Sequence, residues 1–146
     1  MSAKFGLGEK SMEFGCHCRG YRADITQPPT SLVNCHCGFC RQLSGAAYST
    51  WATIRADSFS ILRSDGIRRY RPTDNIARAF CETCGTHVFT EDRRLPGVIG
   101  IPAGIIRGVI LPEPAAHYFV DDKAAWHSIR DAVPCFGGAN GMTPLP

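Results

Sequence analysis

Seven of the eight cysteines in this chain of 146 residues stand in three short groups, and their spacing constrains the fold more than any other feature. The groups are Cys16 and Cys18 in a C-H-C motif, Cys35, Cys37 and Cys40 in a C-H-C-x-x-C motif, and Cys81 and Cys84 in a C-x-x-C-G motif. Thiolates at these spacings are typical zinc ligands, and the glycine after the last group permits the positive φ that closes a metal-binding turn. The eighth cysteine, Cys135, stands alone near the C-terminus.

We expect the clustered cysteines to form one set of four and one set of three. Cys35, Cys37 and Cys40 are close enough in sequence to form a tripod by themselves. The remaining set joins two distant segments and consists of Cys16, Cys18, Cys81 and Cys84. A four-thiolate zinc site is closed and structural, whereas a site with three protein ligands keeps one position open. The sequence therefore predicts two zinc ions, one structural and one with an open position.

Other uses of the cysteines stay open. All seven clustered cysteines could stabilise the fold, with a histidine or Cys135 as the fourth ligand of the second site. For Cys135 itself we favour a small buried apolar side chain. A disulfide framework is disfavoured, because no secretory signal is visible and neighbouring cysteines on one strand are difficult to bridge. His17 and His36 alternate with cysteines, so on strands their side chains would face away from the sulfurs and stay half exposed.

The spacing of apolar residues predicts a mainly β chain. Short strands are expected between frequent turn residues, at 13–18, 21–25, 31–37, 46–54, 59–62, 67–71, 77–81, 87–90, 98–103 and 118–120. Helical turns are expected at 38–44, where a turn would bring Cys40 back over the preceding C-H-C motif, and at 123–129. We place a single zinc-binding domain in residues 1–136 and a loose, Gly/Pro-rich tail in residues 137–146.

Charge and hydropathy narrow the range of partners. The formal net charge is +3, but seven thiolates holding two zinc ions would bring it to zero, so nucleic-acid binding has little support. The longest uncharged apolar stretch, residues 97–106, is interrupted by Pro102 and is too short to span a membrane. The N-terminal residues contain no apolar signal segment, so we expect a cytoplasmic protein with no membrane partner.

In combination, these motifs resemble the glutathione-dependent formaldehyde-activating enzyme / centromere protein V family. The resemblance extends from Gly15 to about Phe136 and rests on G-C-H-C at 15–18, C-H-C-G-F-C-R-Q-L-S-G-A at 35–46, F-C-E-T-C-G-T at 80–86 and H-Y-F-V-D-D-K-A-A-W at 117–126. It implies a compact, tent-like arrangement of small antiparallel sheets organised around two zinc sites, with the same division of the cysteines. One departure is Arg19, because members usually have glycine directly after the first C-x-C.

The activity implied by the resemblance joins a small thiol to a small aldehyde. Zinc held by three thiolates is a weak Lewis acid but suits an incoming sulfur, and a coordinated thiol loses its proton. With glutathione and formaldehyde the product is S-(hydroxymethyl)glutathione, and the reverse reaction is that of a carbon–sulfur lyase. Arg41 and Ser44 follow the tripod directly and are candidate contacts for a substrate carboxylate or amide. The alternative is a non-catalytic zinc module that binds a protein or a thiol-bearing small molecule.

Overall fold

The computed structural model describes residues 11–146, and within them the chain forms three sheets. A three-stranded antiparallel sheet has the order β1-β2-β5 and contains β1 (Met12–Gly15), β2 (Tyr21–Ile25) and β5 (Phe59–Ser64). A seven-stranded sheet has the order β10-β3-β4-β9-β8-β7-β6 and contains β3 (Ser31–Cys35), β4 (Ser49–Arg55), β6 (Ile67–Tyr70), β7 (Ile76–Cys81), β8 (His87–Asp92), β9 (Val98–Pro102) and β10 (His117–Tyr118). Its strand pairs are antiparallel except for β10 with β3. The third sheet pairs β11 (Phe136–Gly137) with β12 (Thr143–Pro144).

Helical structure is sparse in the described chain. It consists of α1 (Gly38–Ser44) and the short 3-10 turns η1 (Ala56–Ser58), η2 (Ala103–Ile105) and η3 (Val120–Asp122). The prediction of a mainly β chain is therefore confirmed, and the helical turn expected at 38–44 is α1. In the range 123–129, where a second helical turn is expected, the structure has no helix but a single hydrogen-bonded turn, in which the His127 amide donates to the Ala124 carbonyl oxygen at 3.1 Å. Between residues 11 and 146, no helix has the length and apolar character needed to cross a membrane.

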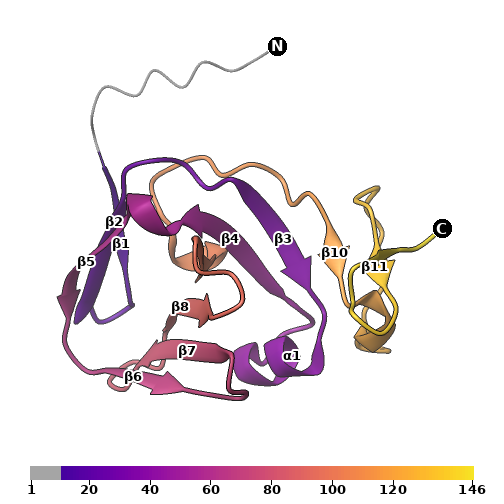
Figure 1. Cartoon of the computed structure of the whole chain (residues 1–146), viewed down its shortest axis with the longest axis horizontal. Coiled ribbons are helices and arrows are strands. Elements are labelled where there is room, and N and C mark those ends of the chain that lie inside the picture. Colours follow the sequence, from indigo (N-terminus) through magenta and orange to yellow (C-terminus); the bar gives the residue numbers. More distant parts are fainter. Residues whose placement is uncertain (1–10) are drawn as a thin grey trace, which may run out of the picture.

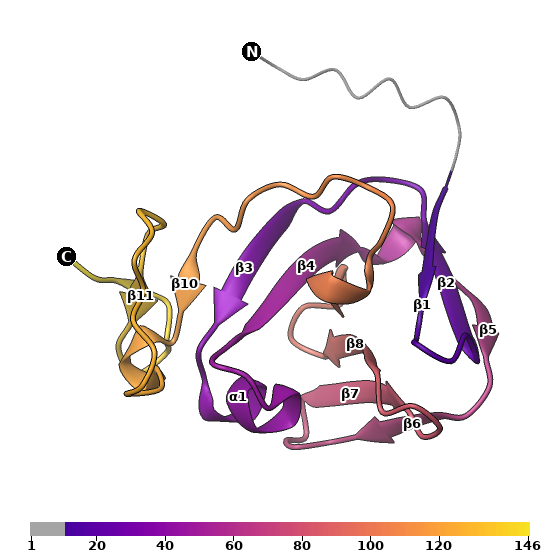
Figure 2. The same ribbon diagram turned by 180° about the vertical axis from the view of Figure 1, so that it is seen from behind.

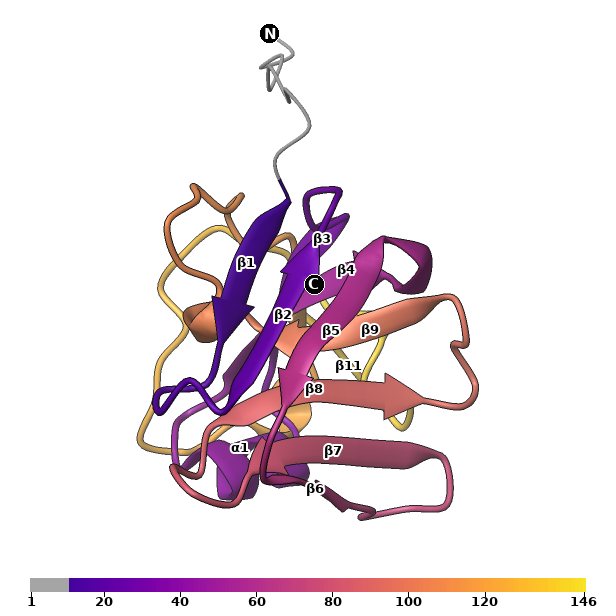
Figure 3. The ribbon, with the colours of Figure 1, turned by 90° about the vertical axis from the view of Figure 1, so that its left-hand side faces the viewer.

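The seven-stranded sheet curves, so that its two halves enclose an interior. Figure 1 shows β3 and β4 on one side of this interior and β6, β7 and β8 on another. The view from behind in Figure 2 places α1 at the corner where these two halves approach each other, beside β7. In Figure 3 the three-stranded sheet lies across β8 and β9 and closes the remaining side. The expected tent-like arrangement of small sheets is thus observed.

The hydrophobic core lies between the two larger sheets. Side chains alternate in direction along a strand, and in β2 the alternate residues Tyr21, Ala23 and Ile25 are fully buried. The Tyr21 ring centroid lies 6.0 Å from that of Phe89 on β8, and the Phe59 centroid on β5 lies 5.9 Å from the same ring. Each such aromatic side chain stabilises the fold by about 2 kcal/mol when buried. These contacts fix the relative position of the walls that carry the cysteines.

The prediction that strands continue through both C-H-C motifs is wrong. β1 ends at Gly15, and the first motif lies in the turn before β2, where the Arg19 amide donates to the Cys16 carbonyl oxygen at 3.1 Å. β3 ends at Cys35, and Cys37 is already the N-cap of α1. The local hydrogen bonds of a turn and of a helix cap replace the strand ladder at these positions, and they bring the sulfurs of each group toward one point.

The C-terminal residues form a small hairpin where the sequence predicts a loose tail. The Leu145 amide donates to the Cys135 carbonyl oxygen, and the Phe119 amide donates to that of Gly141, each at 2.9 Å. Gly141 has a φ of +70° and packs so closely against the Phe119 ring that no Cβ would fit. Gly138 also has a positive φ. The glycines that indicate looseness in the sequence are therefore the residues that allow this hairpin to turn and to pack.

Candidate metal centres

The first candidate metal centre is a set of four cysteines, which we call the quartet. It consists of Cys16, Cys18, Cys81 and Cys84, whose sulfur atoms all lie within 4.8 Å of one another. The Sγ atoms of Cys16 and Cys18 are 3.6 Å apart, and so are those of Cys18 and Cys81. Tetrahedral zinc with Zn–S bonds of ~2.3 Å separates its sulfur ligands by about 3.8 Å. The quartet is thus arranged so that it could hold a metal ion with no open position.

Two backbone turns hold the quartet together. Cys81 ends β7, and the Gly85 amide donates to its carbonyl oxygen at 2.8 Å, with a φ of +75° at Gly85. The buried Sγ of Cys16 accepts a hydrogen bond from the Tyr21 amide at 3.3 Å. The Cys84 sulfur lies 3.2 Å from the Thr86 hydroxyl, and this hydrogen bond is the main reason that the pKa of the Cys84 thiol falls to about 5. These contacts favour the thiolate form that a metal ion needs.

The second candidate centre is the trio of Cys35, Cys37 and Cys40, whose sulfur atoms also lie within 4.8 Å of one another. Cys35 is the last residue of β3, Cys37 is the N-cap of α1, and Cys40 lies in its first turn. Cys37 Sγ accepts a hydrogen bond from the Cys40 amide at 3.4 Å, so the interaction that starts the helix also brings two ligands together. No fourth cysteine, histidine or carboxylate side chain from residues 11–146 joins this set. The structure therefore brings together the predicted sets of four and of three.

The three thiols of the trio differ in their affinity for protons. The neighbouring thiols of Cys35 and Cys37, together with Arg78, lower the pKa of the Cys40 thiol strongly. The pKa of Cys35 is raised, first by the neighbouring thiol of Cys37 and then by that of Cys40. One thiolate is thus stabilised by its protonated neighbours, and a divalent ion would replace the remaining protons. Soft thiolate donors suit zinc better than magnesium or calcium, so both sets fit the predicted metal.

Sequence reasoning missed Arg78, which lies on β7. Its Nη2 atom donates to Cys40 Sγ at 3.4 Å, and its Cζ lies 5.4 Å from the ring centroid of Trp51. Arg78 is only 7% exposed, although arginine is rarely buried without a partner. The signal in the sequence is a single charge within I-A-R-A-F-C, a strand that is otherwise apolar and ends at Cys81 of the quartet.

Arg41 and Ser44, the two residues expected to contact the substrate, lie beside the trio and form hydrogen bonds with backbone carbonyl oxygens. Arg41 Nε donates to the His36 carbonyl oxygen at 3.3 Å, and Ser44 Oγ donates to that of Cys40 at 2.7 Å. Both side chains therefore brace the segment that carries the trio, and contact with a substrate stays a prediction. Cys135 belongs to neither set, and its Sγ lies 3.7 Å from the Val133 carbonyl oxygen.

His36 is fully buried, so the prediction of a half-exposed histidine is wrong for this residue. Its amide donates to the carbonyl oxygen of Tyr118 on β10, and its ring Nε2 lies 2.8 Å from Nδ1 of the buried His117. The ring centroid of Tyr48 lies 4.9 Å from that of His36. These partners come from distant segments, which local alternation does not identify. His17 in the first motif is exposed.

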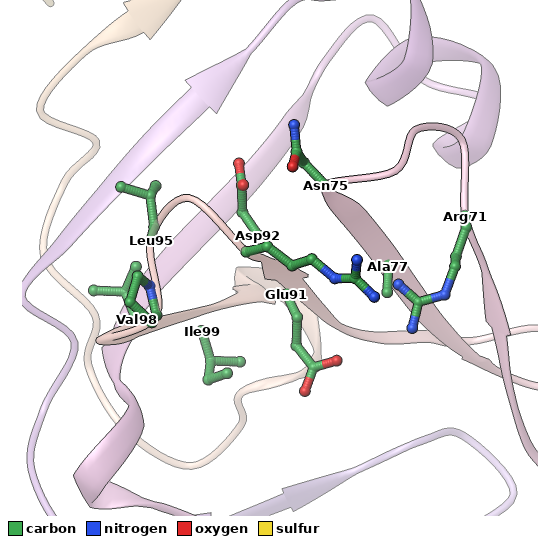
Figure 4. Close-up of a pocket in the computed structure, with 10 residues that line it drawn as sticks. Arg71, Asn75, Ala77, Glu91, Asp92, Leu95, Val98 and Ile99 are labelled. Carbon is green, nitrogen blue, oxygen red and sulfur yellow. The ribbon is translucent and has the colours of Figure 1, made fainter.

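Two hollows border the seven-stranded sheet. One has a volume of about 340 Å³ and is lined by Leu43, Tyr70, Arg78, Phe80, Gly85 and His87. Arg78 connects this hollow to the trio, because it lines the hollow and its guanidinium contacts Cys40. The other has a volume of about 240 Å³, and Figure 4 shows the charged side chains of Arg71, Glu91 and Asp92 around it. No cysteine lines either hollow, but the first contains Arg78, which contacts Cys40, so the first is the candidate substrate cavity.

A match to a known protein family covers both cysteine sets. The family model described as glutathione-dependent formaldehyde-activating enzyme matches residues 11–122. Among solved structures, the crystal structure of a Rhodobacter sphaeroides protein has a TM-score of 0.58 and 24% sequence identity, covering 68% of this chain and 91% of that chain. This likeness concerns the fold alone. No curated protein matches the chain. Because the family model spans most of the sequence, the chain belongs to the glutathione-dependent formaldehyde-activating enzyme family.

Proposed function

We propose that this chain is a zinc-dependent enzyme of thiol–aldehyde adducts, a carbon–sulfur lyase by class, which interconverts S-(hydroxymethyl)glutathione with glutathione and formaldehyde. One observation carries the proposal: three sulfur atoms converge, and no fourth side chain from residues 11–146 completes the set. A tetrahedral ion held by three ligands keeps one position free. Membership of the family supports glutathione and formaldehyde as the substrates.

Each cysteine set would have its own task. The quartet would hold a structural zinc ion that ties the turn before β2 to the turn after β7. The trio would hold the second zinc ion, which supplies a soft centre that favours the deprotonated form of a substrate thiol. Arg78 remains hydrogen-bonded to Cys40 and offsets part of the negative charge that the three thiolates bring together.

The reaction requires orientation of two small molecules and the transfer of one proton. The thiol sulfur forms a bond to the aldehyde carbon, the carbonyl π electrons move to the oxygen, and the oxygen takes up a proton that balances the one lost by the thiol. Arg41 and Ser44 would orient the thiol substrate, because both lie directly beside the trio. Holding the reactants in place converts a chance encounter into an oriented one.

The state of the cysteines supports a cytoplasmic setting for this activity. All eight thiols are free, and seven of them belong to sets that disulfide formation would destroy as metal sites. A reducing compartment keeps such thiols available for zinc.

Exchange NMR with ¹³C-formaldehyde and glutathione tests the proposal, since it measures the rate of adduct formation and cleavage at equilibrium. The zinc-loaded wild type should accelerate this exchange. Cys37→Ser should abolish the acceleration while the circular dichroism spectrum stays native and the quartet keeps its ion. Cys81→Ser should unfold the chain, because a structural zinc ion contributes free energy of folding.

Cys135→Ser is the matched control, because Cys135 belongs to neither set. It should keep both the zinc content and the exchange rate of the wild type. Retention of the acceleration in Cys37→Ser would refute the assigned role of the trio. A wild type that binds two zinc ions without accelerating exchange would favour the non-catalytic zinc module.

A further inference from the structure

Arg78 carries donor atoms that no group in the described chain satisfies. Its Nη2 donates to Cys40 Sγ, but among residues 11–146 neither Nε nor Nη1 has a hydrogen-bond partner. Both atoms are buried, and a buried donor without a partner costs about 1–3 kcal/mol, and more when it is charged. Buried polar groups in folded proteins nearly always have partners, so Arg78 points to an acceptor that a ligand supplies.

Arginines on the neighbouring strand already have acidic partners. Arg68 Nε lies 2.6 Å from the Glu82 carboxylate, and Arg69 Nε lies 3.6 Å from that of Glu91. In the part of the chain that the structure describes, no carboxylate forms such a pair with Arg78. Of these three guanidinium groups, the buried one is therefore the one that lacks a carboxylate partner.

The surroundings of Arg78 strengthen its attraction for an anion. It lines the cavity of about 340 Å³, which is a volume at the lower end of the range for ligand sites. Leu43 and Phe80 contribute apolar walls, and burial lowers the pKa of His87 to about 4, so this histidine is neutral near pH 7. Arg78 is thus the one charged group among the lining residues, in surroundings of low polarity.

The geometry of Arg78 leaves one edge of its guanidinium group without a hydrogen-bond partner. The Trp51 ring lies against the guanidinium, with Cζ 5.4 Å from the ring centroid. A carboxylate binds a guanidinium group through two parallel hydrogen bonds at an edge, and Nη2 belongs to both of the edges that can do this. Because Cys40 uses one hydrogen of Nη2, the other hydrogen still completes one bidentate edge.

We propose that Arg78 binds a carboxylate of the thiol substrate in this cavity and so selects carboxylate-bearing thiols over neutral ones. The inference rests on the proposed function, because it requires that the sulfur of the same molecule reaches the trio. The contact between Arg78 and Cys40 places both anchoring points in one continuous site. Arg78 is then the residue that determines which thiols are bound and oriented.

A thermodynamic cycle tests this inference, with Arg78 changed in the protein and the carboxylates masked in the ligand. Calorimetry gives dissociation constants for glutathione and for its diethyl ester, in which both carboxylates are masked, on zinc-loaded wild type and Arg78→Gln. A charge-assisted pair predicts that the wild type prefers glutathione by about tenfold or more. Arg78→Gln should bind the two compounds within about twofold of each other, because the coupling is lost.

Control variants separate this effect from general damage. Arg63→Gln removes an exposed arginine of β5, in the three-stranded sheet, which pairs with Asp65. This variant should keep the preference for glutathione. Arg78→Lys keeps the positive charge but loses the planar guanidinium that binds a carboxylate through two hydrogen bonds, so it should lose most of the preference. It replaces Arg78→Gln in the experiment if that variant does not fold. A preference that survives in every folded Arg78 variant, or one that disappears in Arg41→Gln instead, overturns the assignment.

S-methylglutathione distinguishes failure of this inference from failure of the proposed function, because it keeps both carboxylates but has no thiol. If the wild type binds it as tightly as glutathione, the trio does not bind the thiol and the proposed function fails. If S-methylation weakens binding and masking of the carboxylates does not, the Arg78 inference fails alone. Absence of binding for all three compounds contradicts both.

Discussion

Nε2 of His36 lies 2.8 Å from Nδ1 of His117, so two histidines 81 positions apart in the sequence share a buried hydrogen bond. Nε2 of His117 lies 3.1 Å from a carboxylate oxygen of Asp131. Because an ionised carboxylate only accepts hydrogen bonds, His117 donates from Nε2, and in its neutral form its Nδ1 then accepts from Nε2 of His36. This chain of hydrogen bonds fixes the residue between Cys35 and Cys37, and through it the first two sulfurs of the trio.

His117→Leu should destabilise the chain by about 1–3 kcal/mol, because it leaves the buried Nε2–H of His36 without an acceptor. The affinity of the trio for Co²⁺ should fall, while that of the quartet should stay the same. Chemical denaturation and cobalt titration measure these two effects. His17→Leu is the control, because His17 is exposed between the cysteines of the quartet, and it should change stability by less than about 0.5 kcal/mol. Equal effects of the two substitutions would argue against a role for the His36–His117 hydrogen bond.

The pH dependence of stability should contain a contribution from His87. Burial and the nearby guanidinium of Arg78 lower the pKa of His87 to about 4 in the folded chain, against about 6.5 in the unfolded chain. As the pH falls from about 6.5 to about 4, the unfolded state takes up a proton that the folded state does not. The folded state therefore has its full stability above this pH range and loses stability as the pH falls through it.

His87→Gln removes this titration while keeping a polar group opposite the Thr90 hydroxyl, which lies 3.0 Å from His87 Nε2. The free energy of unfolding of the wild type, measured relative to that of the variant, should fall by about 2 kcal/mol between about pH 7 and about pH 4.5. Denaturant unfolding at a series of pH values measures it, and metal loss in acid affects both proteins alike. A difference that stays constant with pH is incompatible with the lowered pKa.

Arg19 occupies a position where glycine should be more stable. Its φ is +68°, in the left-handed region that other residues adopt at a cost of about 1 kcal/mol. Its ion pair with Glu13 spans 3.5 Å between exposed side chains and contributes little. Arg19→Gly should therefore raise the free energy of unfolding by about 0.5–1 kcal/mol, seen as a higher Tm. Arg22→Gly within β2 should lower it, and a similar decrease for both would count against strain at Arg19.

The division of the cysteines could be predicted because it depends on local spacing. Cys37 and Cys40 are three residues apart, which is the separation between an N-cap and the backbone amide that it caps, and the helix follows as predicted. Gly85 has the positive φ that the C-x-x-C-G motif requires. In both cases the residues that decide the geometry are neighbours in the sequence.

The surroundings of the trio could not be predicted, because they come from distant segments. The burial of His36 depends on β10, which lies beside β3 as a parallel neighbour. Arg78 reaches Cys40 because α1 lies at the corner beside β7, as Figure 2 shows. Periodicity indicates which side chains face inward, but it does not indicate which element lies opposite them. The candidate cavity, with Arg78 as the one charged side chain that lines it, can therefore be identified only from the three-dimensional structure.

Cobalt substitution tests the open trio most directly, because the intensity of thiolate-to-cobalt charge transfer rises with the number of bound thiolates. With both sets loaded, the chain supplies four thiolates from the quartet and three from the trio. Glutathione should add one more, so the band of the wild type should grow by about one-seventh, and the growth should be absent in Cys37→Ser. An unchanged band in the wild type, or equal growth in the variant, would contradict a trio with a position open to a thiol.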